Sequence, residues 1–282
     1  AVGSSPVTDI NGNIYPTVNI GTQTWMQKNL NVSRYRNGDI IPQVINATQW
    51  ANLTTGAWCW YNNDSVNYSK YGKLYNWYAI NDPRGLAPDG WRLPSDSEMT
   101  TLANYLGGTS LAGGAMKSVS GWALPNTGAT NSSGLTILPG GNCGWDGTFN
   151  YAGFGGYIWN TGDQVTASFR NLDYASNGIL RFTGPKNYGL SIRCIRNTPI
   201  SYLWSTGATT PSITVAPTTT TSYIATVSNG IQSCKDTVKI SIQANPTAPA
   251  TIQKQFVPTS ILAVTNVSGL VSETYRIKKV AN

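Results

Sequence analysis

Alternating apolar and polar positions open the chain and predict short β-strands. Asn11-Gly12 lies between the runs Thr8–Ile10 and Asn13–Tyr15, and this dipeptide between alternating residues is a strong β-hairpin signal. A further run, Thr17–Ile20, is followed after a glycine by Thr24–Met26. We therefore expect the chain to begin with two pairs of antiparallel strands.

Apolar residues at helical spacing predict two helices farther along. Tyr71, Leu74, Tyr75 and Tyr78 recur on one face of a helix, so we expect a short helix over residues 70–80 with these side chains in the core.

The clearest helix signal follows Arg92-Leu93-Pro94. Ser95 and Glu98 have the spacing of a capping box, in which each side chain bonds the backbone amide of the other residue. Met99, Leu102 and Leu106 then form an apolar stripe, and two glycines end the helix. We interpret the stripe as core packing and not as a cofactor site.

The remaining chain predicts strands separated by loops, with a change of composition near residue 196. Trp and Gly become rarer there, and Thr, Val, Ile and Pro take over, which indicates domains at 1–198 and 199–282. The predicted strands are Leu135–Leu138, Gly156–Trp159, Ile179–Phe182, Leu190–Cys194, Tyr202–Trp204, Ser212–Val215, Ser222–Val227, Thr237–Ile242, Ser260–Val264 and Thr274–Lys278.

Composition narrows the function. Ten Trp and fifteen Tyr provide enough surface to bury, so a disordered chain is disfavoured. The net charge of +7 comes from scattered Lys and Arg, and we expect no nucleic-acid partner. No run approaches the length of a membrane span. The absence of histidine removes Ser-His-Asp and Cys-His catalysis and His-ligated metal sites, so we expect no enzyme activity.

Cysteine usage indicates an oxidising compartment. Cys59, Cys143, Cys194 and Cys234 are far apart and form no CxxC, which favours one or two disulfides over a metal or redox site, with the pairing left open. The chain starts at Ala1 without a signal peptide, as a processed mature chain would. We expect a secreted protein.

Asp9, Asn11 and Asn13 superficially resemble the start of a calcium loop, although the rest of that loop is missing and a plain turn explains them. We expect no cofactor and no other metal, with structural calcium at these residues as the one possibility left open.

Several strings in the first two thirds of the chain resemble a known family. They are Thr24–Leu30, Trp60–Asp64, Tyr71–Trp77, Gly90–Asp96, Leu138–Gly141 and Ser191–Cys194. Together, over roughly residues 7–197, they resemble the Fibrobacter succinogenes major paralogous domain, which is common in secreted and surface proteins of Bacteroidota and Fibrobacterota. The chain departs from that pattern at Met99, at Trp159-Asn160-Thr161, and at Ala87-Pro88, where many members have Cys-Pro; the last difference leaves the pairing of Cys194 in doubt.

The helix entry Arg92-Leu93-Pro94 with Glu98 and the terminal Arg193-Cys194 are also similar to the formylglycine-generating and C-type-lectin-like folds. The resemblance implies an α+β, β-rich fold with long loops and about two helices. It also implies a ligand face built by the loops before the last strand. That face would consist of Trp159, Asn160, Asp163, Arg170, Asn171, Tyr174, Asn187 and Tyr188. Aromatic rings and directional hydrogen bonds suit a sugar or protein ligand, while the alternative interpretation is a set of solvated loop residues.

Residues 202–243 resemble the Ig-like or PKD-like repeats of Bacteroidota surface proteins, through Tyr202–Thr210 and Thr221–Val227. The opening strands of such a repeat are missing, so a small all-β Ig-like sandwich would have an open edge. Residues 251–282 could complete it within one chain or by insertion into a neighbour, and repeated insertion would build a filament.

Three functions follow from these observations. The first is a structural subunit of a cell-surface fibre, assembled by self-association through β-strand complementation and displaying the lectin-like domain. The second is a monomeric adhesin or glycan-binding module, whose partners would be glycans or host and cell-surface proteins. The third, which we disfavour, is a formylglycine-generating-like enzyme, because no cysteine pair matches the site that this chemistry needs.

Overall fold

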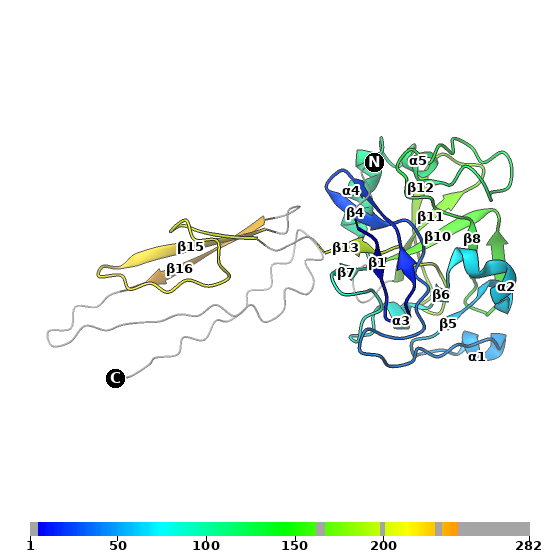
Figure 1. The fold of residues 1–282 in the computed structure, drawn as a ribbon, viewed down its shortest axis with the longest axis horizontal. Coiled ribbons are helices and arrows are strands. Elements are labelled where there is room, and N and C mark those ends of the chain that lie inside the picture. The colour runs from blue at the N-terminus through cyan, green and yellow to red at the C-terminus, as the bar shows by residue number, and fades with distance from the viewer. Residues whose placement is uncertain (1–4, 162–166, 198–200, 229–232, 242–282) are drawn as a thin grey trace. The chain divides into compact units, whose positions relative to one another are not determined.

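The structure is a computed structural model that describes residues 5–161, 167–197, 201–228 and 233–241 (Figure 1). The chain divides into two compact units, Ala1–Asn197 and Thr198–Asn282. Asp163 and the strands expected at Ser260–Val264 and Thr274–Lys278 lie outside the described residues.

The first unit is built around two sheets. The larger sheet has the strand order β12-β11-β10-β8-β9, and the smaller one has the order β3-β4-β13-β7. Their strands are β3 (Thr17–Ile20), β4 (Gln23–Met26), β7 (Trp91–Arg92), β8 (Gly140–Cys143), β9 (Phe149–Ala152), β10 (Gly155–Asn160), β11 (Ala167–Asp173), β12 (Ile179–Gly184) and β13 (Ile195–Arg196). Two short pairs complete the strands, namely β1 (Val7–Thr8) with β2 (Ile14–Tyr15) and β5 (Trp58–Cys59) with β6 (Leu74–Tyr75).

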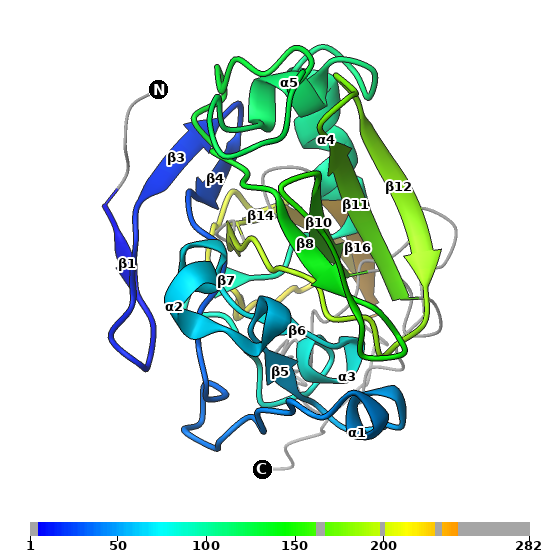
Figure 2. The same ribbon diagram turned by 90° about the vertical axis from the view of Figure 1, so that its right-hand side faces the viewer.

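The helices of this unit are short and lie around the sheets (Figure 2). They are α1 (Ala47–Ala51), α2 (Ser65–Tyr68), α3 (Trp77–Ile80), α4 (Asp96–Tyr105) and α5 (Ala112–Met116), with 3-10 turns at Tyr61–Asn63 and Ser69–Tyr71. In the described ranges no helix combines the length and apolar character needed to cross a bilayer. A β-rich fold with few helices agrees with the expected α+β class.

The N-terminal hairpin is confirmed. Val7 pairs with Tyr15, and Gly12 takes the left-handed backbone conformation that the turn requires, with a φ of 82°. The Asp9 carboxylate is committed to this hairpin. It accepts the amides of Asn11 and Asn13, the side-chain amide of Asn13 and the Tyr15 hydroxyl, the last at 2.6 Å.

The capped helix is also confirmed. The Ser95 hydroxyl accepts the Glu98 amide at 3.2 Å, and the Glu98 carboxylate accepts the Ser95 amide at 2.9 Å. The Glu98 carboxylate also accepts hydrogen bonds from the two terminal guanidinium nitrogens of Arg92. Burial acts to raise the pKa of Glu98, but the contacts with Arg92 and Ser95 outweigh it and lower that pKa. Met99 and Leu102 are buried in a core cluster, as the apolar stripe predicts.

The helix expected over residues 70–80 was wrong. The chain turns at Gly72, where φ is 77° and a side chain would meet the backbone oxygen of Leu30 at 2.9 Å. It then runs as the strand β6 before α3 begins. Tyr71, Leu74 and Tyr75 are buried nevertheless, whereas Tyr78 is half-buried, so the spacing identified three of the four expected core residues but not their secondary structure.

Two predicted strands were also wrong. Residues 135–138 form only a bridge from Ile137 to Lys117, since Thr136 has a φ of 56° and breaks the extended run. Residues 190–194 form only two isolated bridges, Leu190 with Tyr75 of β6 and Ser191 with Ile158 of β10. Each residue pairs with a different element, so no continuous strand forms.

Arg193 fastens the end of the first unit to its beginning. Its guanidinium is buried and donates to the Asn29 side chain and to the backbone oxygens of Met26 and Leu135. The following strand, β13, pairs with β4 on one side and β7 on the other. The smaller sheet therefore exists only once the last residues of the unit are in place.

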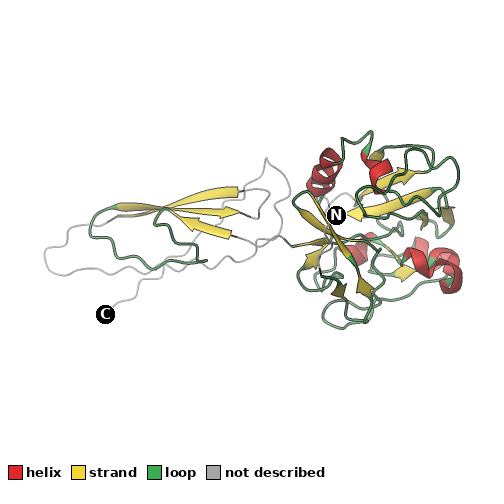
Figure 3. Ribbon diagram, turned by 45° about the horizontal axis from the view of Figure 1, so that its top comes forward, coloured by secondary structure: helices red, strands yellow, loops and turns green. Residues whose placement is uncertain are grey.

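The described part of the second unit is a three-stranded antiparallel sheet of β14 (Ser201–Trp204), β15 (Thr221–Ser228) and β16 (Ser233–Ile240) (Figure 3). The strands predicted at 202–204, 222–227 and 237–242 correspond to these, although the last begins at Ser233 and ends at Ile240, and residue 242 lies outside the described residues. The strand predicted at Ser212–Val215 was wrong, since this segment is an irregular connection.

Candidate functional site

The expected ligand face places four of its residues in strands and not in loops, which corrects that expectation. Trp159 and Asn160 belong to β10, Arg170 and Asn171 to β11, and all four are buried. The Trp159 indole donates to the Tyr75 backbone oxygen at 2.7 Å. Because Trp159 and Asn160 are consecutive in β10, and Arg170 and Asn171 in β11, each pair points to opposite faces of the sheet, and both faces are covered at these positions.

Arg170 is held by α4. Its guanidinium donates to the Asp96 carboxylate at 2.7 Å and to the Thr100 hydroxyl at 3.0 Å, and Asp96 also receives Arg181 at 3.0 Å. Burial lowers the pKa of Arg170, and the Asp96 charge opposes that effect. This arrangement joins the helix to the sheet and leaves Arg170 little freedom to meet a ligand.

The other expected residues are half-buried and lie apart. Tyr174 meets Phe154 edge to face, and Asn187 donates to the backbone oxygens of Ala51 and Trp145. The Tyr188 ring contacts Phe169, which also contacts Trp159. The structure thus joins two of the predicted residues through Phe169 but does not gather the set on one loop face. Ligand binding by these residues stays a prediction.

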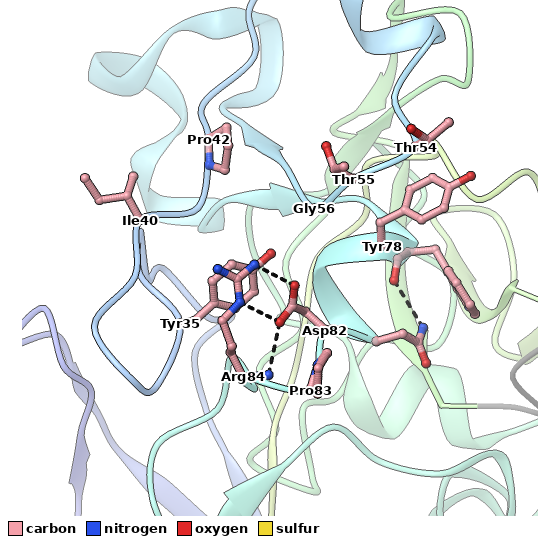
Figure 4. A pocket seen from close by; sticks show the side chains of 12 residues that line it. Tyr35, Ile40, Pro42, Thr54, Thr55, Gly56, Tyr78, Asp82, Pro83 and Arg84 are labelled. Carbon is pink, nitrogen blue, oxygen red and sulfur yellow. Dashed lines mark hydrogen bonds and ion pairs between the residues drawn. The ribbon is translucent and has the colours of Figure 1, made fainter.

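A pocket lies elsewhere on the first unit, between three segments that are distant in sequence (Figure 4). Its volume is about 540 Å³, within the range of ligand pockets. Its lining residues are Tyr35, Ile40, Pro42, Thr54, Thr55, Gly56, Trp77, Tyr78, Asn81, Asp82, Pro83 and Arg84. Aromatic rings therefore line this pocket beside neutral polar groups and one charged pair.

Asn76 fixes two of these segments relative to each other. Its side-chain oxygen caps α3 by accepting the Ala79 amide at 3.0 Å, and it also accepts the Ala57 amide at 3.0 Å. Its side-chain nitrogen donates to the Thr55 backbone oxygen at 2.8 Å. One completely buried side chain thus holds the Thr54–Gly56 wall against the helix that carries Trp77 and Tyr78.

Arg84 braces the opposite wall. Its guanidinium donates to Asp82 through Nε at 2.8 Å and Nη2 at 2.7 Å, and to Asp39 through Nη1 at 2.9 Å. These bonds raise the pKa of Arg84, and the hydrogen bonds from Arg84 lower the pKa of Asp82 and of Asp39. The guanidinium also lies over the Tyr35 ring, 4.0 Å from its centroid. Both carboxylates are therefore kept ionised and in place.

The Tyr35 hydroxyl reaches the base of the pocket because residue 56 is a glycine. A side chain at Gly56 would lie 2.1 Å from that hydroxyl. Burial raises the pKa of Tyr35 to about 12, and the Asp82 charge adds to the increase. The Arg84 guanidinium covers the Tyr35 ring, and we refer to Arg84, Asp82, Asp39 and Tyr35 together as the brace.

The remaining polar groups of the pocket are uncommitted. In the part of the chain that the structure describes, no hydrogen bond engages the hydroxyls of Thr54, Thr55 and Tyr78. The Trp77 ring meets the Tyr78 ring edge to face, and the Lys186 amine lies 4.1 Å from the centroid of the Trp77 ring. Neutral hydroxyls beside aromatic rings can bind a hydroxyl-rich ligand through hydrogen bonds and ring contacts.

Sequence reasoning missed this pocket. Its three walls come from separate loops and a four-residue helix, and none carries a recognised motif. The available signal was the run Asp82-Pro83-Arg84 after the aromatic segment 75–78, which reads as an ordinary turn when taken alone.

All four cysteines are thiols in the structure, so none of the expected disulfides is formed. Cys59 and Cys143 share a small buried cluster, whereas Cys194 lies in another cluster of the first unit. Cys234 is exposed on β16. Among the described residues no group of three metal-ligating side chains occurs.

Comparisons with known proteins identify the first unit. A search of curated proteins and a search of solved structures found no match. The model of the Fibrobacter succinogenes major domain, however, matches residues 18–196, which include the capping box, the pocket and Arg193. The matched span covers more than half of the chain, so the protein belongs to the Fibrobacter succinogenes major domain family.

Proposed function

We propose that this chain is a non-enzymatic extracellular surface protein whose first unit binds glycans through the pocket between Tyr35, Thr55, Tyr78 and Arg84. The family is one of surface-type domains, which is compatible with an extracellular location. One observation carries the proposal. In this pocket the charged side chains of Arg84, Asp82 and Asp39 bind one another, whereas the neutral hydroxyls form no hydrogen bond among the described residues.

The brace makes the pocket rigid before a ligand arrives. The Asp82 carboxylate accepts the Arg84 amide at 3.0 Å as well as two guanidinium nitrogens. Most of its acceptor capacity is thereby occupied. A preformed site loses less conformational entropy on binding than a mobile one.

The chemistry of the free groups selects the ligand class. Because Arg84 and Asp82 bind each other, a charged ligand would have to break that pair. A neutral sugar needs only the hydroxyls of Thr54, Thr55 and Tyr78 and a ring surface such as that of Tyr78. We therefore expect neutral saccharides to bind better than charged ones.

The same groups argue against catalysis. Arg84 lowers the pKa of Asp82, which makes this carboxylate a weak base near neutral pH. Burial raises the pKa of Cys59 and raises that of Cys194 to about 12, so neither thiol is activated as a formylglycine-generating-like reaction would require.

A glycan array probed with the full chain tests this function. We expect neutral oligosaccharides to bind, Tyr78→Ala to remove binding through loss of the ring, and Tyr78→Phe to weaken it through loss of the hydroxyl. Tyr105→Ala is the matched control, since Tyr105 is an exposed tyrosine on α4. Equal glycan binding by the wild type and Tyr78→Ala would show that this pocket is not the binding site.

The second unit supports a second function, as a subunit of a cell-surface fibre. Tyr202 pairs with Val227 and Trp204 with Ala225, while Tyr223 pairs with Val238, so one face of the sheet is largely apolar. Apart from Trp204 and Ile240, its side chains are at least partly exposed. A single layer with an apolar face needs a second layer to exclude water.

The proposed second layer is residues 251–282, from the same chain or from a neighbour, as an Ig-like sandwich would require. Negative-stain electron microscopy of the full chain beside a chain ending at Asn245 distinguishes the two arrangements. Fibres from the full chain alone would support strand exchange between neighbours. Single particles from both chains would reject the fibre, although they would leave the glycan pocket unaffected.

A further inference from the structure

We propose that Cys59 and Cys143 form a disulfide in the exported protein, and that this bond fastens one wall of the pocket to the large sheet. The two residues come from different parts of the first unit. Cys59 ends β5, and Cys143 ends β8. The structure holds them as a dithiol that is ready to be oxidised.

The shared burial of the two thiols carries the inference. Their side chains are 0% and 1% exposed and belong to the same small core cluster, which also contains Trp50, Ala57 and Leu74. Cys143 also has little room to turn away. A side chain at the facing Gly189 would lie 2.9 Å from the Cys143 Cβ and 2.8 Å from the Trp50 ring. The space beside Cys143 is therefore filled on the side of Gly189, and its thiol donates to the Gly144 backbone oxygen at 3.7 Å.

The other two cysteines have different surroundings. Cys194 is buried near Arg193, Arg36 and Asp9, whose charges act on its thiol. Cys234 is exposed on β16 and pairs across the sheet with Val227. The structure thus assigns one bond, and it leaves Cys194 and Cys234 as thiols.

The oxidation needs a disulfide as electron acceptor, such as that of a thiol–disulfide oxidoreductase or oxidised glutathione. The Cys59 thiolate attacks the acceptor disulfide and forms a mixed disulfide, releasing one acceptor thiol. The Cys143 thiolate then attacks the Cys59 sulfur and releases the second. The two protons pass to the released thiolates, and two electrons reduce the acceptor, so the exchange balances.

Burial determines when this reaction occurs. The apolar cluster raises the pKa of the Cys59 thiol, and the thiolate is the reactive form. An external oxidant also has no path to a sulfur without exposed surface. We therefore expect the bond to form while the cluster is still open during folding, and the reduced folded protein to oxidise slowly.

The bond would act on the pocket through a short connection. Cys59 lies three residues after Gly56, and the Thr54–Gly56 wall continues directly into β5. The bridge would close a loop of about 84 residues, and a loop of that length gives a large stabilisation in the chain-entropy description. The wall would then be fixed to β8 as well as to α3.

Mapping of the intact protein tests the proposal. The full chain, produced through an oxidising compartment, is alkylated under denaturing conditions and digested without reductant. We expect a Cys59–Cys143 peptide pair about 2 Da lighter than the two thiols, and alkylation at Cys194 and Cys234 only. Four alkylated thiols, or any link that includes Cys194 or Cys234, would overturn the assignment.

Variants give a second measurement. We expect reductant to lower the melting temperature of the wild type on the order of 10 °C. Cys59→Ser and Cys143→Ser should lose this response, whereas Cys194→Ala and Cys234→Ser should keep it. If a serine variant does not fold, peptide mapping of the wild type still decides the question, independently of glycan binding.

Discussion

The guanidinium of Arg84 meets the carboxylate of Asp82 side by side, with Nε 2.8 Å from one oxygen and Nη2 2.7 Å from the other. The same guanidinium binds Asp39 and covers the Tyr35 ring. A single side chain therefore organises one wall of the pocket, and the behaviour of that wall can be tested residue by residue.

Replacing Arg84 should weaken glycan binding. Arg84→Ala leaves Asp82 and Asp39 without their common partner and uncovers the Tyr35 ring, so we expect at least a fivefold loss of affinity by calorimetry. Arg84→Lys should not restore it, because an ammonium cannot form the paired contacts. Arg196→Ala is the control, since Arg196 is an exposed arginine on β13. Unchanged affinity in Arg84→Ala would show that the brace is dispensable.

Binding should be lost in both acid and alkali, because the brace has two titrating ends. The pKa of Asp82 lies below its usual 3.8, so its contribution is complete above that value and disappears as pH falls through the lowered pKa. The pKa of Tyr35 is raised from 10.0 to about 12, so its contribution is complete below 10.0 and disappears as pH rises through 12. Affinity measured across this range should be flat between the two limits.

A single methyl group at residue 56 should disturb the pocket base. Gly56→Ala places a carbon where the Tyr35 hydroxyl now lies, and we expect a loss of about 1 to 3 kcal/mol in the free energy of unfolding. Urea denaturation measures it. Thr54→Ala, an exposed change in the same wall, should leave stability unchanged. If Gly56→Ala were as stable as the wild type, the close contact with Tyr35 would not exist in solution.

Removing the helix cap should destabilise α4. Ser95→Ala deletes the oxygen that accepts the Glu98 amide, which costs about 1 kcal/mol in comparable caps. Thermal or urea unfolding reports the change, with the exposed Ser69→Ala as the control. A larger loss is expected for Glu98→Ala, because this change also leaves Arg92 without its carboxylate.

Chelation should not change the melting temperature. The two oxygens of Asp9 already accept four hydrogen bonds from the hairpin, so calcium would have to displace them. Differential scanning calorimetry with and without a chelator tests this expectation. A fall in melting temperature with chelator, reversed by calcium, would establish a structural site and contradict the turn interpretation.

Local signals in the sequence predicted local structure well. The capping box of Ser95 and Glu98 and the Asn11-Gly12 turn involve neighbouring residues, so their physics is complete within a short window. The aromatic run around Tyr75 was different, because Gly72 turns the chain for the sake of a contact with Leu30. Leu30 lies 42 positions before Gly72, so nothing in the sequence around Tyr75 indicates this contact.

The pocket and the ligand face show the same limit. Trp159 and Arg170 have the chemistry of binding residues, but neighbouring strands and α4 enclose them, and this depends on the sheet order. Tyr35, Gly56 and Arg84 lie in separate segments and become a pocket only through Asn76 and the ion pairs. The family resemblance was confirmed, since it depends on the sequence alone.

Arg193 has a consequence for how the first unit folds. It bonds Met26 across 167 positions, and β13, which completes the smaller sheet, follows it. While the chain emerges from the ribosome, the hairpin of β3 and β4 has no second neighbour until β13 has been synthesised, about 170 residues later. Such long-range closure makes folding slow. The first unit therefore becomes a folded domain only after its last strand has been synthesised.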